Sequence, residues 1–254
     1  MKTFIKKIIS KTGYEISRKN RLIGEDGIPV DIQEKIFTEI YSRCKDFTVT
    51  TVEPLYALYK SVEYVVNINL QGDFVECGVW KGGSAMMIAH ILLQLKQTHR
   101  KIFLYDTFEG MATPSDIDED YTGKKAKQLL ESENKSDNDS VWRYCSLDDV
   151  KKNLASTAYP MENIIFVKGK VEDTIPQQMP EKISLLRLDT DWFESTYHEL
   201  HYLFPLLSGK GVLIIDDYGH WKGAREAVDK YFEETKQEIL LNRIDYTVRV
   251  GIKS

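Results

Sequence analysis

The sequence predicts an α/β fold of the doubly wound kind, with a seven-stranded, mostly parallel sheet and helices on both faces. From residue 72 onward, short apolar runs that end in glycine or acidic residues alternate with helical stretches. Continuous apolar strands separated by helices indicate a parallel sheet that is covered on both faces. The chain has 254 residues, 42% of them hydrophobic, and can bury one sizeable core. We therefore expect one α/β domain over residues 71–254, preceded by a helical extension and cap over residues 1–70.

Composition excludes several classes of protein. The net charge is −5, from 34 Lys and Arg against 39 Asp and Glu, whereas a nucleic-acid-binding protein needs concentrated positive charge. The three cysteines are far apart and form no CxxC, which disfavours a disulfide framework and a thiolate zinc site. No apolar run is long enough to span a bilayer, and Lys6 and Lys7 interrupt the N-terminus before a signal peptide could form. We expect a cytoplasmic protein without a nucleic-acid partner or a membrane span.

The first 70 residues are predicted to be helical. Residues 1–22 carry seven basic residues against one Glu, and four apolar residues would share one helical face. We expect this helix to dock on the body or on a second subunit, which favours a homodimer; a membrane-surface contact through the lysines is the alternative. Residues 31–45 and 54–68 have the pattern of amphipathic helices, and Pro54 suits the first turn of the second.

The remaining elements follow in order along the chain. Five parallel strands are expected at 73–78, 101–106, 163–169, 183–189 and 211–216. Helices are expected between and after them at 83–97, 146–155, 194–207 and 222–236. Residues 238–244 and 246–252 are β-rich and could pair as a terminal hairpin. In such sheets ligands bind outside the carboxyl ends of the strands, so the functional site is expected there.

Residues 109–145 interrupt this alternation. The segment is long, polar and acidic, and it follows the carboxyl end of a strand. Loops of this length inside compact domains are usually functional lids or disordered segments. We predict a mobile lid over the site, with a short helix at 124–132.

A glycine-rich turn joins the first strand to its helix within residues 72–90. Gly78 permits the sharp turn, while Gly82 and Gly83 let a ligand approach the backbone near the helix N-terminus. The spacing is G-x-x-x-G-G and differs from the G-x-G-x-x-G of dinucleotide-binding proteins. Glu76 would repel a pyrophosphate but could attract a cationic ligand that carries an amino group or a sulfonium. Turns of this kind also occur for packing reasons alone.

Acidic residues follow two further strands. Asp106 ends the second strand, where an acid typically accepts hydrogen bonds from ribose hydroxyls; the alternative is a helix N-cap or a solvated loop acid. Glu172 or Asp173, beyond the third strand, could line an adenine pocket. These two segments predict the rest of a nucleoside-binding cleft.

Four aspartates give the strongest signal. Asp189 and Asp191 lie at the carboxyl end of the strand expected at 183–189, and Asp216 and Asp217 lie at that of the strand expected at 211–216. Adjacent strands lie about 4.8 Å apart, so the four carboxylates should converge, and their burial is costly unless a cation neutralises them. Oxygen ligands with open positions suit Mg²⁺. Helix capping would explain one Asp at each strand end, but not two.

The histidines say less about function. His220, just after the second acidic pair, could contact a substrate. His198 and His201 could chelate a metal, although an i, i+3 pair on a helix more often lies on a packed or solvated face. The sequence contains no G-x-S-x-G elbow and no P-loop, so hydrolases of those kinds and NTP hydrolysis lose support.

Four segments in order, FVECGVWKGGS, LYDTFEGM, LRLDTDWFESTYHEL and LIIDDYGHWKGAREAVDKYF, resemble the macrocin O-methyltransferase (TylF-like) family, from about residue 50 to the end. The resemblance implies a class I methyltransferase (Rossmann-like) fold that uses S-adenosylmethionine and Mg²⁺ to methylate sugar hydroxyls. It implies that Asp191 is the general base. The implied metal ligands are Asp189, Asp216 and Asp217. The implied cofactor-binding residues are Glu76, Gly78, Gly82, Ser84, Asp106, Thr107 and Glu172. One departure is Pro54, where many relatives are expected to have Arg.

These observations lead to one expected reaction and three alternatives. We expect Mg²⁺-dependent O-methylation of a small-molecule acceptor, a sugar or glycoside, because a metal would lower the high pKa of a sugar hydroxyl. A catechol-type acceptor would bind the metal in the same way. An NAD-binding oxidoreductase and a non-catalytic binding protein are the remaining alternatives, and the glycine spacing and the four acids disfavour them.

Overall fold

The computed structural model describes residues 22–24, 27–135, 137 and 140–254. The helix predicted within residues 1–22 lies, apart from Leu22, outside this range. The chain divides into two compact units, residues 1–38 and 39–254. In the first unit, Ile23 and Pro29 form an antiparallel bridge and the Gly24 N–H donates to the Ile28 carbonyl at 2.7 Å. All the residues considered for the functional site belong to the second unit.

Helices precede the sheet, as the sequence predicts. They are α2 (Lys35–Cys44), the 3₁₀ turn η1 (Lys45–Phe47) and α3 (Val52–Asn67). Pro54 is the third residue of α3, in its first turn, where a missing N–H costs nothing. The buried residues of α3 include Leu55, Leu58, Val62 and Val65, whose spacing of three and four defines one apolar helix face.

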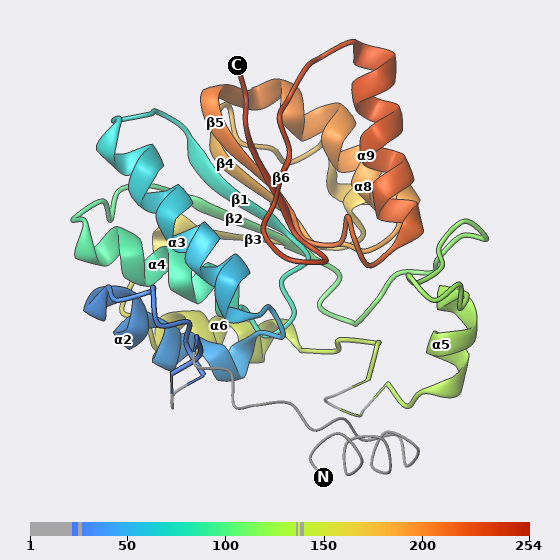
Figure 1. The fold of residues 1–254 in the computed structure, drawn as a ribbon, viewed down its shortest axis with the longest axis horizontal. Coiled ribbons are helices and arrows are strands. Elements are labelled where there is room, and N and C mark those ends of the chain that lie inside the picture. The colour runs from blue at the N-terminus through green and yellow to red at the C-terminus, as the bar shows by residue number, and fades with distance from the viewer. Residues whose placement is uncertain (1–21, 25–26, 136, 138–139) are drawn as a thin grey trace, which may run out of the picture. The chain divides into compact units, whose positions relative to one another are not determined.

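The sheet has seven strands in the order β3-β2-β1-β4-β5-β7-β6 (Figure 1). Their bounds are β1 Asp73–Cys77, β2 Ile102–Asp106, β3 Ile164–Lys168, β4 Ile183–Leu188, β5 Leu207–Ile215, β6 Asn242–Arg243 and β7 Arg249–Ile252. Strands β1 to β5 pair in parallel, while β7 is antiparallel to β5 and pairs with β6 as the predicted terminal hairpin. The predicted α/β fold class is therefore confirmed, and the strand order reverses between β1 and β4, where such sheets bind ligands.

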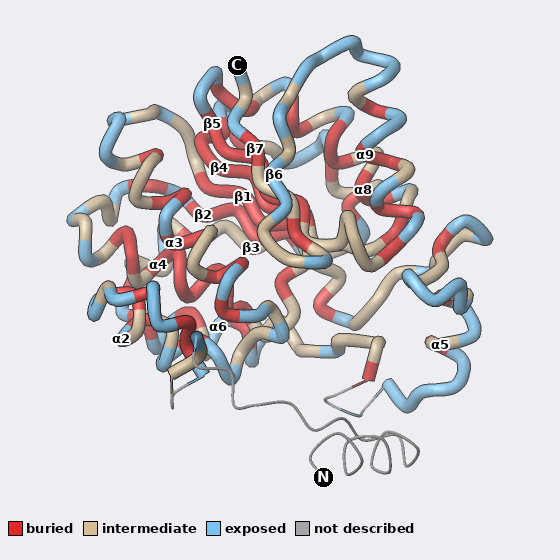
Figure 2. The backbone as a smooth tube through the Cα atoms, viewed as in Figure 1, coloured by how far each residue is buried: buried red, intermediate tan, exposed pale blue. Residues whose placement is uncertain are grey.

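Helices α3, α4 and α6 cover one face of the sheet, and α8 and α9 cover the other (Figure 1). The helices after β1 are α4 Gly83–Gln94, α5 Ala126–Ser132, α6 Leu147–Ala155, α7 Val171–Thr174, α8 Phe193–Leu203 and α9 Lys222–Thr235, with 3₁₀ turns η2 Met161–Asn163 and η3 Phe204–Leu206. Burial is concentrated in the central strands (Figure 2), and every residue of β4 is buried. Among the described residues, no helix combines the length and the hydropathy needed to cross a membrane.

The segment over residues 109–145 contains the predicted short helix, α5, and is packed against the body. The Asp118 side chain has 0% exposure, and its carboxylate accepts hydrogen bonds from the backbone N–H groups of Ser115 (2.7 Å) and Phe193 (2.8 Å). Because Phe193 is the first residue of α8, Asp118 ties the segment to the start of that helix. The indole N–H of Trp192 donates to the Ala112 carbonyl at 3.0 Å. The mobile lid stays a prediction; the structure shows the segment docked.

Candidate active site

A cavity of about 470 Å³ lies at the carboxyl ends of the central strands. Its walls come from the loops that follow β1, β2, β3, β4 and β5, from residues 47–51 before α3, and from the 109–145 segment. Nearly all the predicted site residues line it: Glu76, Gly78, Ser84, Asp106, Thr107, Glu172, Asp189, Asp191, Asp216, Asp217 and His220. The structure thus brings these residues together in one cavity, at the edge of the sheet where strand topology predicts a ligand site; their roles stay predictions.

The glycine turn after β1 touches the loop after β4. Gly78 has φ +82°, and a Cβ added there would lie 1.8 Å from the Asp189 carbonyl oxygen. Only a residue without a side chain fits this approach. Gly82, the residue before α4, has φ +88° and packs against α6, since an added Cβ would lie 2.7 Å from Leu154 Cδ2. Gly82 is not among the residues that line the cavity, so its visible role is packing; its contact with the cofactor stays a prediction.

Asp106 stabilises the glycine turn. Its Oδ2 accepts hydrogen bonds from the backbone N–H groups of Val79 (2.7 Å) and Trp80 (3.1 Å), and its Oδ1 accepts one from Phe108 at 2.6 Å. Burial raises the pKa of Asp106, and these N–H donors oppose that rise. Sequence reasoning offered a ribose contact, a helix cap or a solvated acid, and it missed this structural role. The ribose contact remains a prediction, because the carboxylate still borders the cavity.

Glu76, in β1, has one carboxylate oxygen bound and one free. The side chain is 1% exposed, and Oε1 lies 2.7 Å from Nη1 of Arg187. The buried Oε2 has no hydrogen-bond partner among the residues that the structure describes. Burial raises the pKa of Glu76 to about 7, although the neighbouring guanidinium lowers it. The free oxygen fits the predicted attraction for a cationic group in the cavity.

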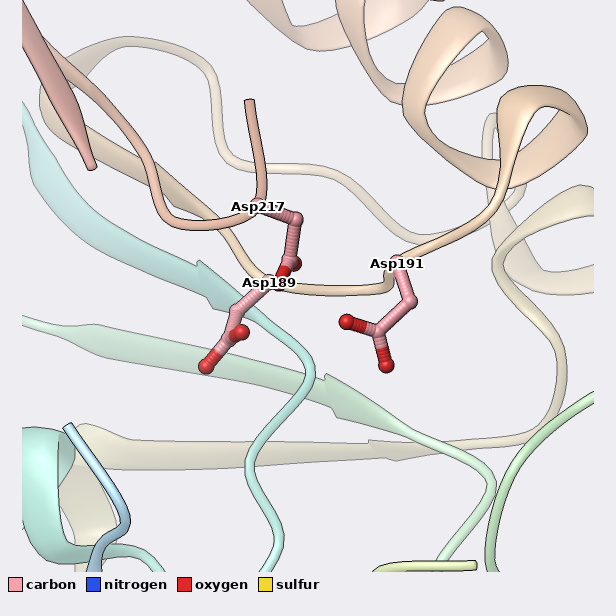
Figure 3. A group of neighbouring side chains, drawn as sticks. All are labelled: Asp189, Asp191 and Asp217. Carbon is pink, nitrogen blue, oxygen red and sulfur yellow. The ribbon is translucent and has the colours of Figure 1, made fainter. Parts of the chain in front are cut away.

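Three of the four predicted aspartates gather in one place. Asp189, Asp191 and Asp217 each offer a carboxylate oxygen within 4.8 Å of the other two. Figure 3 shows that their carboxylates lie around a common space, next to the loops that follow β4 and β5. Burial raises the pKa of Asp191 to about 7 and those of Asp189 and Asp217 well above the usual value, and mutual repulsion adds to this. The nearby guanidinium groups of Arg187 and Arg143 lower these pKa values but do not cancel the rise.

This cluster fits a hard divalent cation. Asp217 Oδ2 is buried and has no hydrogen-bond partner within the described part of the chain, and an orphaned carboxylate oxygen of this kind is costly. Asp216 lies outside the group of three: its Oδ1 is 2.9 Å from Nη2 of Arg187. The geometry thus groups Asp191 with the two predicted ligands Asp189 and Asp217, whereas the resemblance implied Asp216 as the third. The ligand set remains open between these two acids.

Arg187, near the end of β4, is the main residue that sequence reasoning missed. Its side chain is 3% exposed, and it lies within ion-pair distance of Glu76, Asp189 and Asp216. A signal was present in the sequence, because ISLLRL is an apolar strand with one charged residue, and a buried arginine requires acidic partners. The sequence of the strand alone does not identify the acidic partners of Arg187.

The cavity is also lined by aromatic and basic side chains that the sequence analysis, apart from His220, did not single out. His220 Nδ1 lies 3.2 Å from the Tyr246 hydroxyl, and the ring of Tyr121 lies 5.3 Å from the His220 ring. Trp221 and Arg143 also line the cavity. The rings of His220, Trp221 and Tyr246 form an aromatic wall of the cavity.

His198 and His201 do not line the cavity. His198 Nε2 lies 2.9 Å from the Ile175 carbonyl oxygen, and both rings pack against Tyr202. The packed helix face, the more common arrangement for such a pair, is the one observed. Of the two acids considered for the adenine pocket, Glu172 lines the cavity and Asp173 does not.

The order of the strands, the glycine turn after β1 and the acids at the strand ends are together those of a class I methyltransferase. The chain belongs to the macrocin O-methyltransferase (TylF) family, whose model matches residues 44–250. It is similar to demethyldecarbamoylnovobiocin O-methyltransferase from Streptomyces niveus (32% identity over 184 residues, 72% of this chain and 67% of that protein). It is also similar to mycinamicin III 3″-O-methyltransferase from Micromonospora griseorubida (30% over 184 residues, 72% and 69%).

Solved structures agree with this assignment. The O-methyltransferase NovP superposes with a TM-score of 0.71 at 26% identity, over 82% of each chain. The calicheamicin methyltransferase CalS11 has a TM-score of 0.56 at 16% identity, over 94% of this chain and 98% of that one, and shows the fold alone. The protein is an S-adenosylmethionine-dependent O-methyltransferase, so the predicted family, fold and enzyme class are confirmed and the NAD-binding oxidoreductase loses its support.

Proposed function

We propose that this enzyme is a Mg²⁺-dependent O-methyltransferase that methylates a hydroxyl of a sugar or glycosylated small molecule. One observation carries the proposal: three carboxylate oxygens lie within 4.8 Å of one another, in the cavity that also contains the glycine turn. The names of two relatives support a sugar acceptor. One, from Streptomyces olivaceus, is 32% identical over 184 residues and is named as the 4′-O-methyltransferase of a rhamnosyl-bearing tetracenomycin; the other is the mycinamicin III 3″-O-methyltransferase.

The β1–β2 side of the cavity is suited to the cofactor, S-adenosylmethionine, which supplies the methyl group. Glu76 Oε2 is placed to accept hydrogen bonds from a cationic amino group, because it is buried and unpartnered in the described structure. The N-terminus of α4, with Ser84 in its first turn, offers backbone N–H donors. Asp106 and Thr107 border the same space after β2, and Glu172 borders it after β3. These residues would hold the cofactor without repelling its positive charge.

The β4–β5 side would hold the metal and the acceptor. Asp189 and Asp217 would ligate the ion, with Asp216 as the third ligand that the family resemblance implies. A bound Mg²⁺ would lower the pKa of an acceptor hydroxyl and fix its orientation. Asp191 would accept the hydroxyl proton at its carboxylate as the methyl group is transferred. Its pKa, raised to about 7 by burial, is close to the value that suits a general base at neutral pH.

The proposal is tested by methyl transfer from labelled S-adenosylmethionine to a panel of nucleotide sugars, glycosides and catechols, with Mg²⁺ or with excess chelator. We expect labelled product from a sugar-bearing acceptor, lost in chelator and restored by Mg²⁺. Asp173→Asn, an exposed acid outside the cavity, is the control variant for the site aspartates. Full activity in chelator would contradict the metal requirement, and transfer to catechols alone would contradict the sugar acceptor.

The predicted homodimer and the cytoplasmic location are tested separately. Light scattering on the purified full chain measures the first, with twice the monomer mass expected. Fractionation of the source cells measures the second, with the protein expected in the cytoplasmic fraction. Neither outcome affects the chemistry proposed for the cavity.

A further inference from the structure

One buried arginine connects the cofactor side of the cavity with its acidic side. Nη1 of Arg187 lies 2.7 Å from Glu76 Oε1 and 2.7 Å from Asp189 Oδ2, and Nη2 lies 2.9 Å from Asp216 Oδ1. The three acids come from three neighbouring strands or their carboxyl ends, β1, β4 and β5. Nη2 also donates to the Thr50 hydroxyl at 3.1 Å, from the segment before α3. One guanidinium therefore holds four separate pieces of backbone together.

Each of the three carboxylates contacts Arg187 through one of its two oxygens. Arg187 Nη1 donates hydrogen bonds to Oε1 of Glu76 and Oδ2 of Asp189. Its contact with Asp216 Oδ1 is an ion pair without a hydrogen bond, because that buried oxygen has no hydrogen-bond partner among the described residues. The second oxygen of Glu76 is buried and unpartnered in the described structure. Groups behind the first ligand shell, when they bind a ligating residue in this way, fix the direction in which the ligand atom points.

Charge alone does not explain this arrangement. Five carboxylates share the site with this one guanidinium: Glu76, Asp189, Asp191, Asp216 and Asp217. One positive charge cannot neutralise five carboxylates. Burial, followed by repulsion between the acids, raises the pKa of Asp189 and Asp217 although Arg187 lowers it. A planar guanidinium does supply several donors in fixed directions, which an ammonium does not.

We infer that Arg187 is a positioning residue that, through directed hydrogen bonds, aims the second carboxylate oxygen of Asp189 at the divalent cation and the free oxygen of Glu76 at the cofactor. The inference rests on the cation site of the proposed function. A role through charge and a role through positioning predict opposite changes in Mg²⁺ affinity when Arg187 is removed. If Arg187 acted only through its charge, its removal would make the cluster more negative and Mg²⁺ would bind more tightly. Positioning predicts the opposite, a loss of Mg²⁺ affinity.

The test is calorimetric titration of the full chain with Mg²⁺, and separately with S-adenosylhomocysteine, for the wild type and Arg187→Met. We expect the Mg²⁺ affinity to fall by about 10- to 100-fold, the usual effect of losing a partner behind the first ligand shell, and the cofactor-analogue affinity to fall as well. Arg100→Met is the matched control. Arg100 is also a buried arginine, but it donates to the carbonyls of Leu70 and Gly72 before β1, away from the cavity.

Two further variants keep the inference testable if Arg187→Met folds poorly. Arg187→Lys keeps the positive charge but lacks the planar fork, so we expect it to fold and still to bind Mg²⁺ weakly. Methylguanidinium added to Arg187→Ala should restore Mg²⁺ affinity, whereas methylammonium should not. Thermal unfolding of each variant shows that it is folded at the titration temperature.

The outcomes separate the two proposals. Wild-type protein that binds no Mg²⁺ would overturn the cation site of the proposed function itself. Wild-type binding, together with equal or tighter Mg²⁺ binding in folded Arg187→Met or Arg187→Lys, would overturn the role of Arg187 alone. Loss of affinity in both variants but not in Arg100→Met supports that role.

Discussion

The two sides of the cavity are built differently. On the β1–β2 side, both carboxylate oxygens of Asp106 accept hydrogen bonds from backbone N–H groups. The protein's own hydrogen bonds therefore hold the glycine turn in place. On the β4–β5 side, Asp189, Asp191 and Asp217 lie close together with raised pKa values, and Asp217 keeps an orphaned buried oxygen. On the first side the backbone of the glycine turn has its hydrogen-bond acceptors within the protein, and among the described residues Glu76 Oε2 is the buried carboxylate oxygen left there for a ligand. The second side is under electrostatic strain that a bound cation would relieve.

The largest effect is expected from the acids of the strained side. Asp191→Asn should lower turnover by roughly 10²- to 10⁴-fold, because general-base catalysis contributes about that much, while binding of S-adenosylhomocysteine is retained. Asp216→Asn should instead remove the Mg²⁺ dependence or all activity. Turnover and Mg²⁺ titrations measure both. Loss of Mg²⁺ binding in Asp191→Asn with retention in Asp216→Asn would show that the geometric group of Asp189, Asp191 and Asp217 is the ligand set.

The next largest effect is expected at the contact between the glycine turn after β1 and the loop after β4. Gly78→Ala places a Cβ 1.8 Å from the Asp189 carbonyl oxygen at φ +82°. We expect a loss of more than about 2 kcal/mol in the free energy of unfolding, since backbone strain and overpacking each cost about 1–3 kcal/mol. Gly123→Ala is the control, because Gly123 has φ +85° with nothing within 4 Å of the added Cβ. Equal unfolding free energies for the two variants would contradict the close contact.

A smaller effect is expected where the 109–145 segment is anchored. Asp118→Ala leaves the Phe193 and Ser115 N–H groups without their acceptor. Because both hydrogen bonds are only partly buried, we expect a total cost of about 1–2 kcal/mol in the free energy of unfolding, measured as faster proteolysis within 109–145. Asp116→Ala, an exposed neighbour, should cleave at the wild-type rate. Unchanged proteolysis in Asp118→Ala would show that other contacts hold the segment down.

The smallest effect concerns the aromatic wall. Tyr246→Phe removes the hydroxyl that lies 3.2 Å from His220 Nδ1. We expect the KM for the acceptor to rise about fivefold, since one hydrogen bond contributes about 1 kcal/mol, with the KM for S-adenosylmethionine unchanged. Tyr202→Phe, on α8 and outside the cavity, is the control. Equal shifts in both KM values would place Tyr246 at the cofactor instead of the acceptor.

Local patterns in the sequence were enough to place the elements and the acids. The alternation of apolar runs with helical stretches indicated buried strands before Cys77, Asp106 and Asp189. Acids at the carboxyl ends of parallel strands meet at one edge of the sheet. The amphipathic pattern and the position of Pro54 likewise predicted α3 to within a few residues, and the short helix expected at 124–132 corresponds to α5. These features depend on neighbours in the chain.

Tertiary structure alone decided which partner each polar group has. Asp106 accepts hydrogen bonds from the glycine turn, and Arg187 connects β1, β4 and β5. Asp118, in the 109–145 segment, accepts a hydrogen bond from the first N–H group of α8. Each of these contacts joins residues tens of positions apart, and its direction depends on side-chain geometry that only the packed sheet fixes. The sequence by itself determined the fold and the edge where acids gather; folding determined which oxygens remain free for ligands, because burial and hydrogen bonding are properties of the assembled core.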